Sequence, residues 1–331
     1  MNASTPPPRS HTPAEIALRS AIDMPSLLPP EPASLFAERA LRLRELAAGH
    51  AMRDYLMLMA LVCEAQHARA RTGPAPRLPT VQQIGAARDA GEPVLKAVGW
   101  RRDPLWRDEW RALVRQVLDQ LPADSPARAG VQAAATLQDA ALEQQAERLL
   151  AGITLGLDMA SAPLIAAGLQ LHWARLAAGT LAAHGDAFAP SHDSTTCPCC
   201  GSLPTASVTR VGGQLDGQRY LYCALCASQW HLPRVICTHC LQTRGIYYRA
   251  LQDLAGAAPT HARPAIEAET CDSCRHYLKI VHMGRNAHVE PIADDLATVT
   301  LDLLAGDAGF TRHGTNLLLL FGDAEAEPGL A

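Results

Sequence analysis

Four pairs of cysteines, each separated by two residues, carry the clearest chemistry in this 331-residue sequence. They read CPCC, CALC, CTHC and CDSC and begin at Cys197, Cys223, Cys237 and Cys271. A redox pair of the thioredoxin kind needs only one such motif, at a helix start inside a β/α unit. A tight turn that directs two thiolates at one point is half of a tetrahedral metal site, so four turns predict two sites.

The segments between the pairs indicate which pairs share an ion. The first pair is followed by a strand, a glycine-rich turn and a strand leading into the second pair, and the third and fourth pairs repeat this order with a longer loop. Pairing of the first with the third remains an alternative. The expected ligands are Cys197, Cys200, Cys223 and Cys226 for the first site, and Cys237, Cys240, Cys271 and Cys274 for the second.

Other residues near the cysteine pairs are expected to have structural roles and not to bind the metal. Cys199, at the third position of its turn, is expected to face away from the metal; a free thiol open to oxidation or a substitute ligand are the alternatives. Gly201 suits a left-handed residue after the turn, so the turns followed by Ala227, Leu241 and Arg275 are expected to be less regular. Eight thiols complete two tetrahedra, so the nearby histidines are expected to be strand or turn residues: His231, His239, His276, His282 and His288.

A metal is needed because each ribbon of strands has little apolar surface to bury, and its core alone would be marginal. Structural zinc contributes about 10 to 16 kcal/mol in apparent binding energy. That matches or exceeds the total stability of a domain, about 5 to 15 kcal/mol. We therefore expect two metal ions, iron or zinc, and we expect a ribbon to unfold when one of its cysteine pairs is removed.

The half of the chain before the cysteines predicts a helical domain. Residues 34–184 are rich in Ala, Leu, Arg and Glu, and their apolar residues recur at helical spacing. Ser34 is expected to cap one long helix that bends near Gly49, and another helix is expected to open at Asp103. Cys63, in an apolar run of the first helix, is expected to be a buried, inert thiol.

These features predict an α+β chain with an all-α helical domain, two tandem ribbons of the rubredoxin or zinc-ribbon kind, and a short C-terminal helix. The expected parts are a mobile proline-rich segment (1–30), a helical bundle (31–190), the first ribbon (191–234), the second ribbon (235–292), and a C-terminal helix with a tail (293–331).

Composition argues against several classes of protein. A net charge of -4 and a pI near 6.3 give no global attraction to nucleic acid or to an anionic membrane. The most apolar window, residues 153–171, is interrupted by Asp158 and Pro163, so no membrane insertion is expected. The first thirty residues lack the pattern of a secretion signal, which favours a cytoplasmic protein. No catalytic constellation stands out, so we expect no enzyme.

The sequence resembles the bacterial formate dehydrogenase accessory proteins of the FdhE type. The resemblance rests on CPCCGSLP, RYLYCALCASQWHLPRVICTHC, CDSCRHYLKI and ADDLATVTLDLLA, and it covers about Ala21 to Phe321. It implies a cytoplasmic maturation factor with two rubredoxin-like ribbons that can bind iron. Such proteins are needed for active respiratory formate dehydrogenases and contact their catalytic large subunit. The eight paired cysteines match the family pattern, and Cys199 departs from it.

The sequence is compatible with three functions. The first is a metal-binding, chaperone-like factor that binds the catalytic subunit of formate dehydrogenase; whether it forms a homodimer is left open. The second is an electron-transfer module with iron in one or both sites. The third is a nucleic-acid-binding zinc ribbon, but residues 197–290 carry nine Lys or Arg against six Asp or Glu, a thin surplus for phosphate binding.

Overall fold

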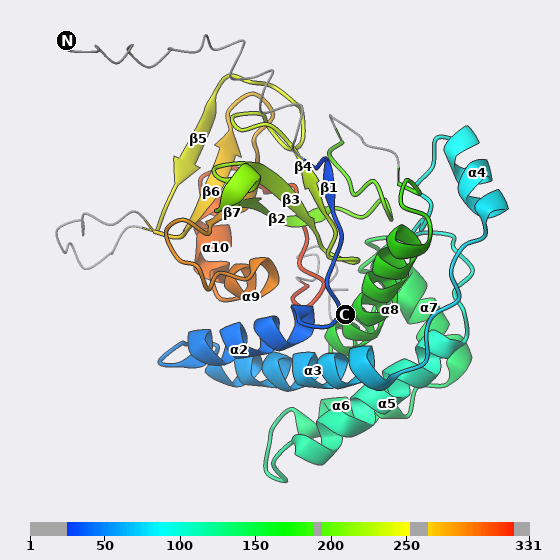
Figure 1. Cartoon of the computed structure of the whole chain (residues 1–331). Coiled ribbons are helices and arrows are strands. Elements are labelled where there is room, and N and C mark those ends of the chain that lie inside the picture. The colour runs from blue at the N-terminus through cyan, green and yellow to red at the C-terminus, as the bar shows by residue number, and fades with distance from the viewer. Residues whose placement is uncertain (1–24, 189–193, 252–263, 321–331) are drawn as a thin grey trace, which may run out of the picture.

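The protein has a helical half and a β half (Figure 1), and its main hydrophobic core contains residues of both. The computed structural model describes residues 25–188, 194–251 and 264–320. Within these residues, strand β1 is followed by seven helices and then by strands β2 to β7; two more helices and strand β8 come after them, and the eight strands form one sheet. The expected α+β class is confirmed. None of the described helices combines the length and apolarity needed to cross a membrane.

The helices of the first half pack as a bundle in which α8 is buried on nearly all sides. Two of them, α2 and α3, lie side by side, and α5 packs against both α3 and α8 (Figure 1). The bounds are α2 (Leu35–Ala47), α3 (Arg53–Thr72), α4 (Val81–Asp89), α5 (Leu105–Gln120), α6 (Arg128–Ala135), α7 (Asp139–Leu150) and α8 (Ala162–Ala183).

The expectation of one long helix bent near Gly49 is wrong, because α2 and α3 are separate helices joined by a reversing turn. Gly49 has a φ of +70°, a left-handed conformation that stops a helix and that glycine adopts without steric strain. His50 then holds the turn: its carbonyl accepts from the N–H of Arg53 at 3.0 Å, and its Nδ1 accepts from the N–H of Met52 at 3.0 Å. The two apolar faces can therefore pack against each other.

Side chains set the starts of the next two helices. Helix α4 was not expected, yet Thr80 and Gln83 form a capping box in which each side chain accepts from the other residue's backbone N–H. Helix α5 begins at Leu105, one residue later than expected, with Pro104 as its N-cap, and Asp103 Oδ1 accepts from the N–H of Leu105 at 3.0 Å. Local hydrogen bonds thus satisfy N–H groups that a helix start leaves free.

The two expected ribbons join into one sheet of order β1-β4-β3-β2-β7-β6-β5. Within each ribbon the strands are antiparallel, and the ribbons meet where β2 runs parallel to β7, with Ser207 opposite Ile280. The strand bounds are β1 (Leu27–Leu28), β2 (Pro204–Thr209), β3 (Arg219–Cys223), β4 (Gln229–His231), β5 (Ile246–Arg249), β6 (Ile266–Cys271), β7 (His276–His282) and β8 (Thr311–Arg312).

Strand β1 brings the start of the described chain to the sheet. Leu27 lies opposite Trp230 of β4, and the carbonyl of Pro25 accepts from the Tyr220 hydroxyl at 2.8 Å. This strand falls inside the segment 1–30 that was expected to be mobile; residues 1–24 of that segment lie outside the described residues. Strand β8 pairs with the first residues of β7, while β2 pairs with the last.

The expected C-terminal helix is two helices, α9 (Pro291–Leu296) and α10 (Val299–Asp307). Helix α9 lies between α2 and the strands β2 and β7 (Figure 1), so it couples the helical half to the sheet. Helix α10 covers the second ribbon through a small separate core that contains Ala268, Tyr277, Leu301 and Phe310. Residues 321–331 of the expected tail lie outside the described residues.

Candidate metal centres

Backbone hydrogen bonds shape the turns that carry the cysteine pairs. In the second pair, the N–H of Cys223 donates to the carbonyl of Ser228 at 3.0 Å, which closes the turn. The N–H groups of Leu225 and Cys226 point back to Cys223 Sγ at 3.4 and 3.3 Å. The third pair repeats this pattern around Cys237. Donors aimed at sulfur favour the thiolate, which is the form that binds metal.

The expectation that three of the turns are less regular is wrong, since all four are followed by a left-handed residue. Their φ angles are +78° at Gly201, +59° at Ala227, +60° at Leu241 and +58° at Arg275. In three turns the N–H of that residue donates to the carbonyl of the first cysteine, at 2.8 to 3.1 Å. The turn geometry therefore overrides the preference of non-glycine residues, at a cost of about 1 to 3 kcal/mol each.

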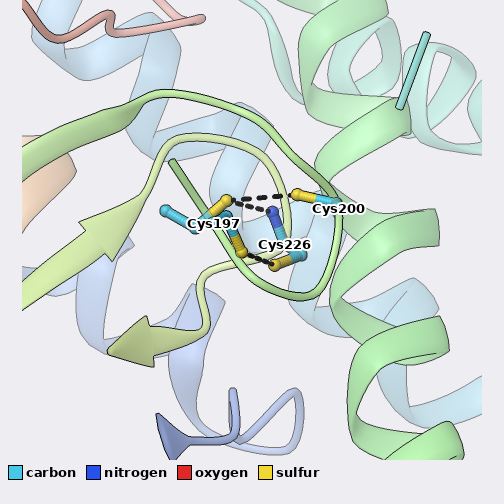
Figure 2. Close-up of side chains that lie close together, drawn as sticks. Cys197, Cys200 and Cys226 are labelled. Carbon is cyan, nitrogen blue, oxygen red and sulfur yellow. Dashed lines mark hydrogen bonds between the residues drawn. The ribbon is translucent and has the colours of Figure 1, made fainter. Parts of the chain in front are cut away.

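The first four-sulfur group has the dimensions of a metal cage. Cys197 Sγ lies 3.5 Å from Cys226 Sγ, Cys200 Sγ lies 3.5 Å from Cys223 Sγ, and the four sulfurs all lie within 4.8 Å of one another. A tetrahedron with metal to sulfur distances of about 2.3 Å has edges of about 3.8 Å. These cysteines are not disulfide-bonded. Figure 2 shows the sulfurs of Cys197, Cys200 and Cys226 converging from two facing loops.

Because the four sulfurs are buried, they can all be ionised only if a cation binds between them. All four ligands are at most 1% exposed. Burial raises the pKa of the Cys197 and Cys223 thiols well above the usual value. Burial also opposes ionisation of Cys226, but hydrogen bonds from the neighbouring thiols outweigh it and lower that pKa. Four thiolates this close would repel one another strongly, so the donor set fits a tetrahedral thiophilic ion such as iron or zinc.

The first site is attached directly to the helical half. The carbonyls of Cys199 and Cys200 accept from the N–H groups of Leu95 and Ala97, each at 2.9 Å. On the other loop, Gln170 of α8 donates from its side-chain amide to the carbonyl of Ala224 at 2.8 Å. Both loops of the first site are therefore held by the α4 to α5 connection and by α8.

The second four-sulfur group has similar spacing but lies nearer the surface. Cys237 Sγ is 3.6 Å from Cys274 Sγ, and Cys240 Sγ is 3.7 Å from Cys271 Sγ. Cys240 and Cys274 are partly exposed, unlike any ligand of the first site. The structure thus groups the first cysteine pair with the second and the third with the fourth, and not in the crossed arrangement.

Cys199 belongs to neither four-sulfur group, but it is not directed to solvent. Its side chain is fully buried, and its thiol interacts with Cys197, Cys226 and Ser228. Burial raises the pKa of this thiol well above the usual value. Cys63, in α3, is buried as well, and burial raises its pKa to about 12, as expected of an inert core thiol.

The histidines occupy strands and turns, but three of them also gather beside the second site. His239, in the third cysteine turn, stacks on His276 with a centroid distance of 3.7 Å, and His313 meets His239 edge-on at 5.2 Å. Sequence reasoning missed this cluster. The available signal was local: His239 lies between two ligands, and His276 follows Cys274 by two residues.

Fold and site together define a class: a helical domain fused to two tandem four-cysteine ribbons that share one sheet. Three sequence models of one family match consecutive parts of the chain, described as FdhE N-terminal (residues 24–186), FdhE central domain (196–234) and FdhE C-terminal domain (235–319). The chain therefore belongs to the FdhE family.

Individual relatives agree with this assignment. The chain is 34% identical over 311 residues to an FdhE homolog of Cronobacter sakazakii and 33% identical over 311 residues to FdhE of Salmonella dublin. Each alignment spans 93% of this chain and 95% of the relative. The crystal structure of the FdhE protein from Pseudomonas aeruginosa is 33% identical, with a TM-score of 0.76, and the match covers 90% of this chain and 100% of the other.

Proposed function

We propose that this protein is a metal-binding accessory factor that binds the catalytic subunit of formate dehydrogenase and helps it to mature in the cytoplasm. The observation that carries the proposal is the match to all three FdhE domains, in order, over residues 24–319. In this proposal the protein is not itself an enzyme. Its two ions are held by the eight paired cysteines, and they would serve first to stabilise the ribbons.

A surface on the second ribbon supports binding of a protein client. Large apolar side chains are exposed on and around the edge strand β5, and we call this set the β5 edge. An edge strand presents unpaired backbone groups that can bind another chain, and exposed apolar patches mark interaction sites. The β5 edge contains Val235, Leu241, Tyr247, Tyr248 and Leu251. Tyr247 and Tyr248 are adjacent on the strand and so project to opposite sides of it.

A pull-down from an anaerobic extract tests the proposal. Tagged full-length protein is expected to retain the formate dehydrogenase catalytic subunit, either before or after that subunit receives its cofactors. If neither form is retained, the proposed function is wrong.

A Tyr247→Asp variant tests the surface separately, with Val81→Asp on exposed helix α4 as the matched control. If both variants bind equally well, the function stands and the β5 edge is not the contact.

The partial exposure of the second site favours electron transfer as a second candidate function. A tetrathiolate iron site near the surface can pass one electron to a partner, whereas zinc in the same cage has no redox chemistry. Metal analysis of protein purified anaerobically distinguishes the two. Iron with a visible absorption that is lost on reduction would support this candidate, and a colourless protein with two zinc ions would exclude it.

A further inference from the structure

A third group of metal-ligating side chains lies against the second four-cysteine site. The ligand atoms of His239, Cys274 and His276 all lie within 4.8 Å of one another. Cys274 is also a member of the second four-sulfur group, so the two groups share one sulfur. Two imidazoles and one thiolate suit a divalent d-block cation such as Zn²⁺, Fe²⁺ or Co²⁺. The rings of His239 and His276 stack in parallel at 3.7 Å, so their in-plane lone pairs do not converge, and the exposed His239 ring must turn before both can bind one ion.

The hydrogen bonding of His276 resembles that of a metal ligand. Its Nδ1 lies 2.8 Å from the carbonyl oxygen of Cys274. A carbonyl can only accept, so Nδ1 carries the proton and the lone pair is on Nε2. Histidines that bind metals almost always donate their other ring N–H to a carbonyl or carboxylate, which fixes the ring and the tautomer.

The exposure of these residues falls off toward the second site. His239 is exposed, His276 and Cys274 are partly buried, and Cys271 is buried. One path from solvent to the four sulfurs therefore leads past the two imidazoles to Cys274, and a second reaches the partly exposed Cys240 directly. Among the described residues, the first site has no such neighbouring group, and its four ligands are closed off by the helical half.

We propose that His239, His276 and Cys274 form an entry site that takes a divalent d-block cation from solvent and passes it to the second four-cysteine site. Cys274 loses its proton to solvent when the cation first binds. Cys237, Cys240 and Cys271 then release their protons and replace the two imidazoles as ligands, while Cys274 stays bound. The metal keeps its oxidation state throughout, so no oxidant or reductant is needed.

If the cluster has only a structural role, a different result is expected. The ring stack then supports the third cysteine turn, and removing it would weaken metal binding at the second site. An entry site lowers the barrier for a cation in both directions. Its loss therefore slows arrival and departure equally and leaves the equilibrium affinity of the second site unchanged.

The test follows metal exchange in the full-length protein with both sites loaded with zinc. Excess Cd²⁺ is added anaerobically, and protein-bound zinc is measured over time. In the unsubstituted protein we expect one equivalent to exchange fast and the buried first site to exchange slowly. His239→Ala and His276→Ala are expected to slow the fast phase about tenfold, which corresponds to a barrier higher by about 1.4 kcal/mol. His288→Ala, an exposed histidine outside the cluster, should leave it unchanged.

Two measurements decide between the readings. Zinc affinity of the second site, measured by competition with a chelator, should stay the same in His239→Ala while both exchange rates fall. The variant His239→Cys supplies another thiophilic ligand at the same exposed position, and we expect it to restore fast exchange. Unchanged exchange in both alanine variants, or a loss of affinity that accounts for the whole rate change, would overturn the proposal.

Discussion

Several non-glycine residues have a left-handed backbone conformation. The turns to which they belong require it, although it is unfavourable for their residue types. Val235 has a φ of +62° and lies exposed between β4 and the third cysteine turn. A β-branched residue is strained in that region, whereas glycine is not. We expect Val235→Gly to raise the free energy of unfolding by about 1 kcal/mol, measured by urea denaturation of the metal-loaded protein.

The matched control is Val211→Gly, because Val211 is also exposed but does not have a positive φ. There glycine only adds freedom to the unfolded chain, so stability should fall by about 0.5 to 1 kcal/mol. Equal losses in the two variants would mean that the backbone at Val235 is not strained.

A buried histidine in the bundle makes stability depend on pH. Burial lowers the pKa of His172, in α8, to about 4. Its unfolded pKa is about 6.5, so the unfolded chain takes up the proton first and stability falls as pH decreases from 6.5 toward 4. From pH 7 to pH 5.5 this residue should remove about 1 kcal/mol of stability.

His172→Leu should remove that part of the pH dependence. The measurement compares the free energy of unfolding of both proteins at pH 7 and pH 5.5, so that contributions from other titrating groups cancel. Identical pH dependence in the two proteins would show that His172 is able to ionise in the folded state.

At the scale of elements, helix α8 is positioned by a close approach to α5. A Cβ added at Gly168 would lie 2.6 Å from Trp110 Cδ1 and 3.0 Å from Trp110 Cβ. The Trp110 ring is itself fixed, because its Nε1 donates to the carbonyl of Leu164 at 3.0 Å. We expect Gly168→Ala to destabilise the protein by about 1 to 3 kcal/mol through overpacking, measured by thermal unfolding.

Gly85→Ala in α4 provides the contrast, since nothing lies within 4 Å of the added methyl group. Alanine is the better helix former by about 1 kcal/mol, so this variant should be slightly more stable than the natural chain. If Gly168→Ala also stabilised the protein, the two helices would have room that the structure does not show.

Elements whose signals are local could be predicted from the sequence, and the others could not. Strands β2, β3, β6 and β7 fall where the segments between and after the cysteine turns predict them. The break after α2 was missed because Gly49 looks tolerable inside a strong helical pattern. Strand β1 has only two residues, and what defines it is Trp230, about two hundred positions away. The left-handed conformation of Leu241 likewise depends on the closed turn and not on the residue itself.

At the scale of the whole molecule, the two metal sites stand in different relations to the core. The first site belongs to the main hydrophobic core, which runs from α2, α3 and α8 into the first ribbon. A buried ion pair, Arg39 with Glu290 at 3.0 Å, ties α2 to the start of α9, and Arg39 also donates to the Tyr222 hydroxyl. These contacts join segments far apart in sequence, so the sequence predicted both four-cysteine sets but not that one of them is part of the bundle.

The first metal site is coupled more strongly to the helical bundle than the second, so losing a metal ligand should have different effects at the two sites. Cys226→Ser removes a ligand from the buried first site, and a structural metal contributes about 10 to 16 kcal/mol, as much as a whole domain has. Because that site shares the main core, the helices should melt together with the first ribbon at a much lower temperature. Cys240→Ser removes a partly exposed ligand from the second site. The cysteines of that site lie outside the main core, although β7 of the same ribbon contributes Leu278 and Val281 to it.

Circular dichroism at 222 nm during heating, with metal content measured in parallel, separates the two outcomes. Cys240→Ser should lose one equivalent of metal yet keep a cooperative helical transition close to that of the natural chain. Cys226→Ser should lower the midpoint of that transition sharply. If the two variants melted alike, the first site would not be coupled to the bundle, and the hydrogen bonds from Leu95, Ala97 and Gln170 to its loops would contribute little to holding the halves together.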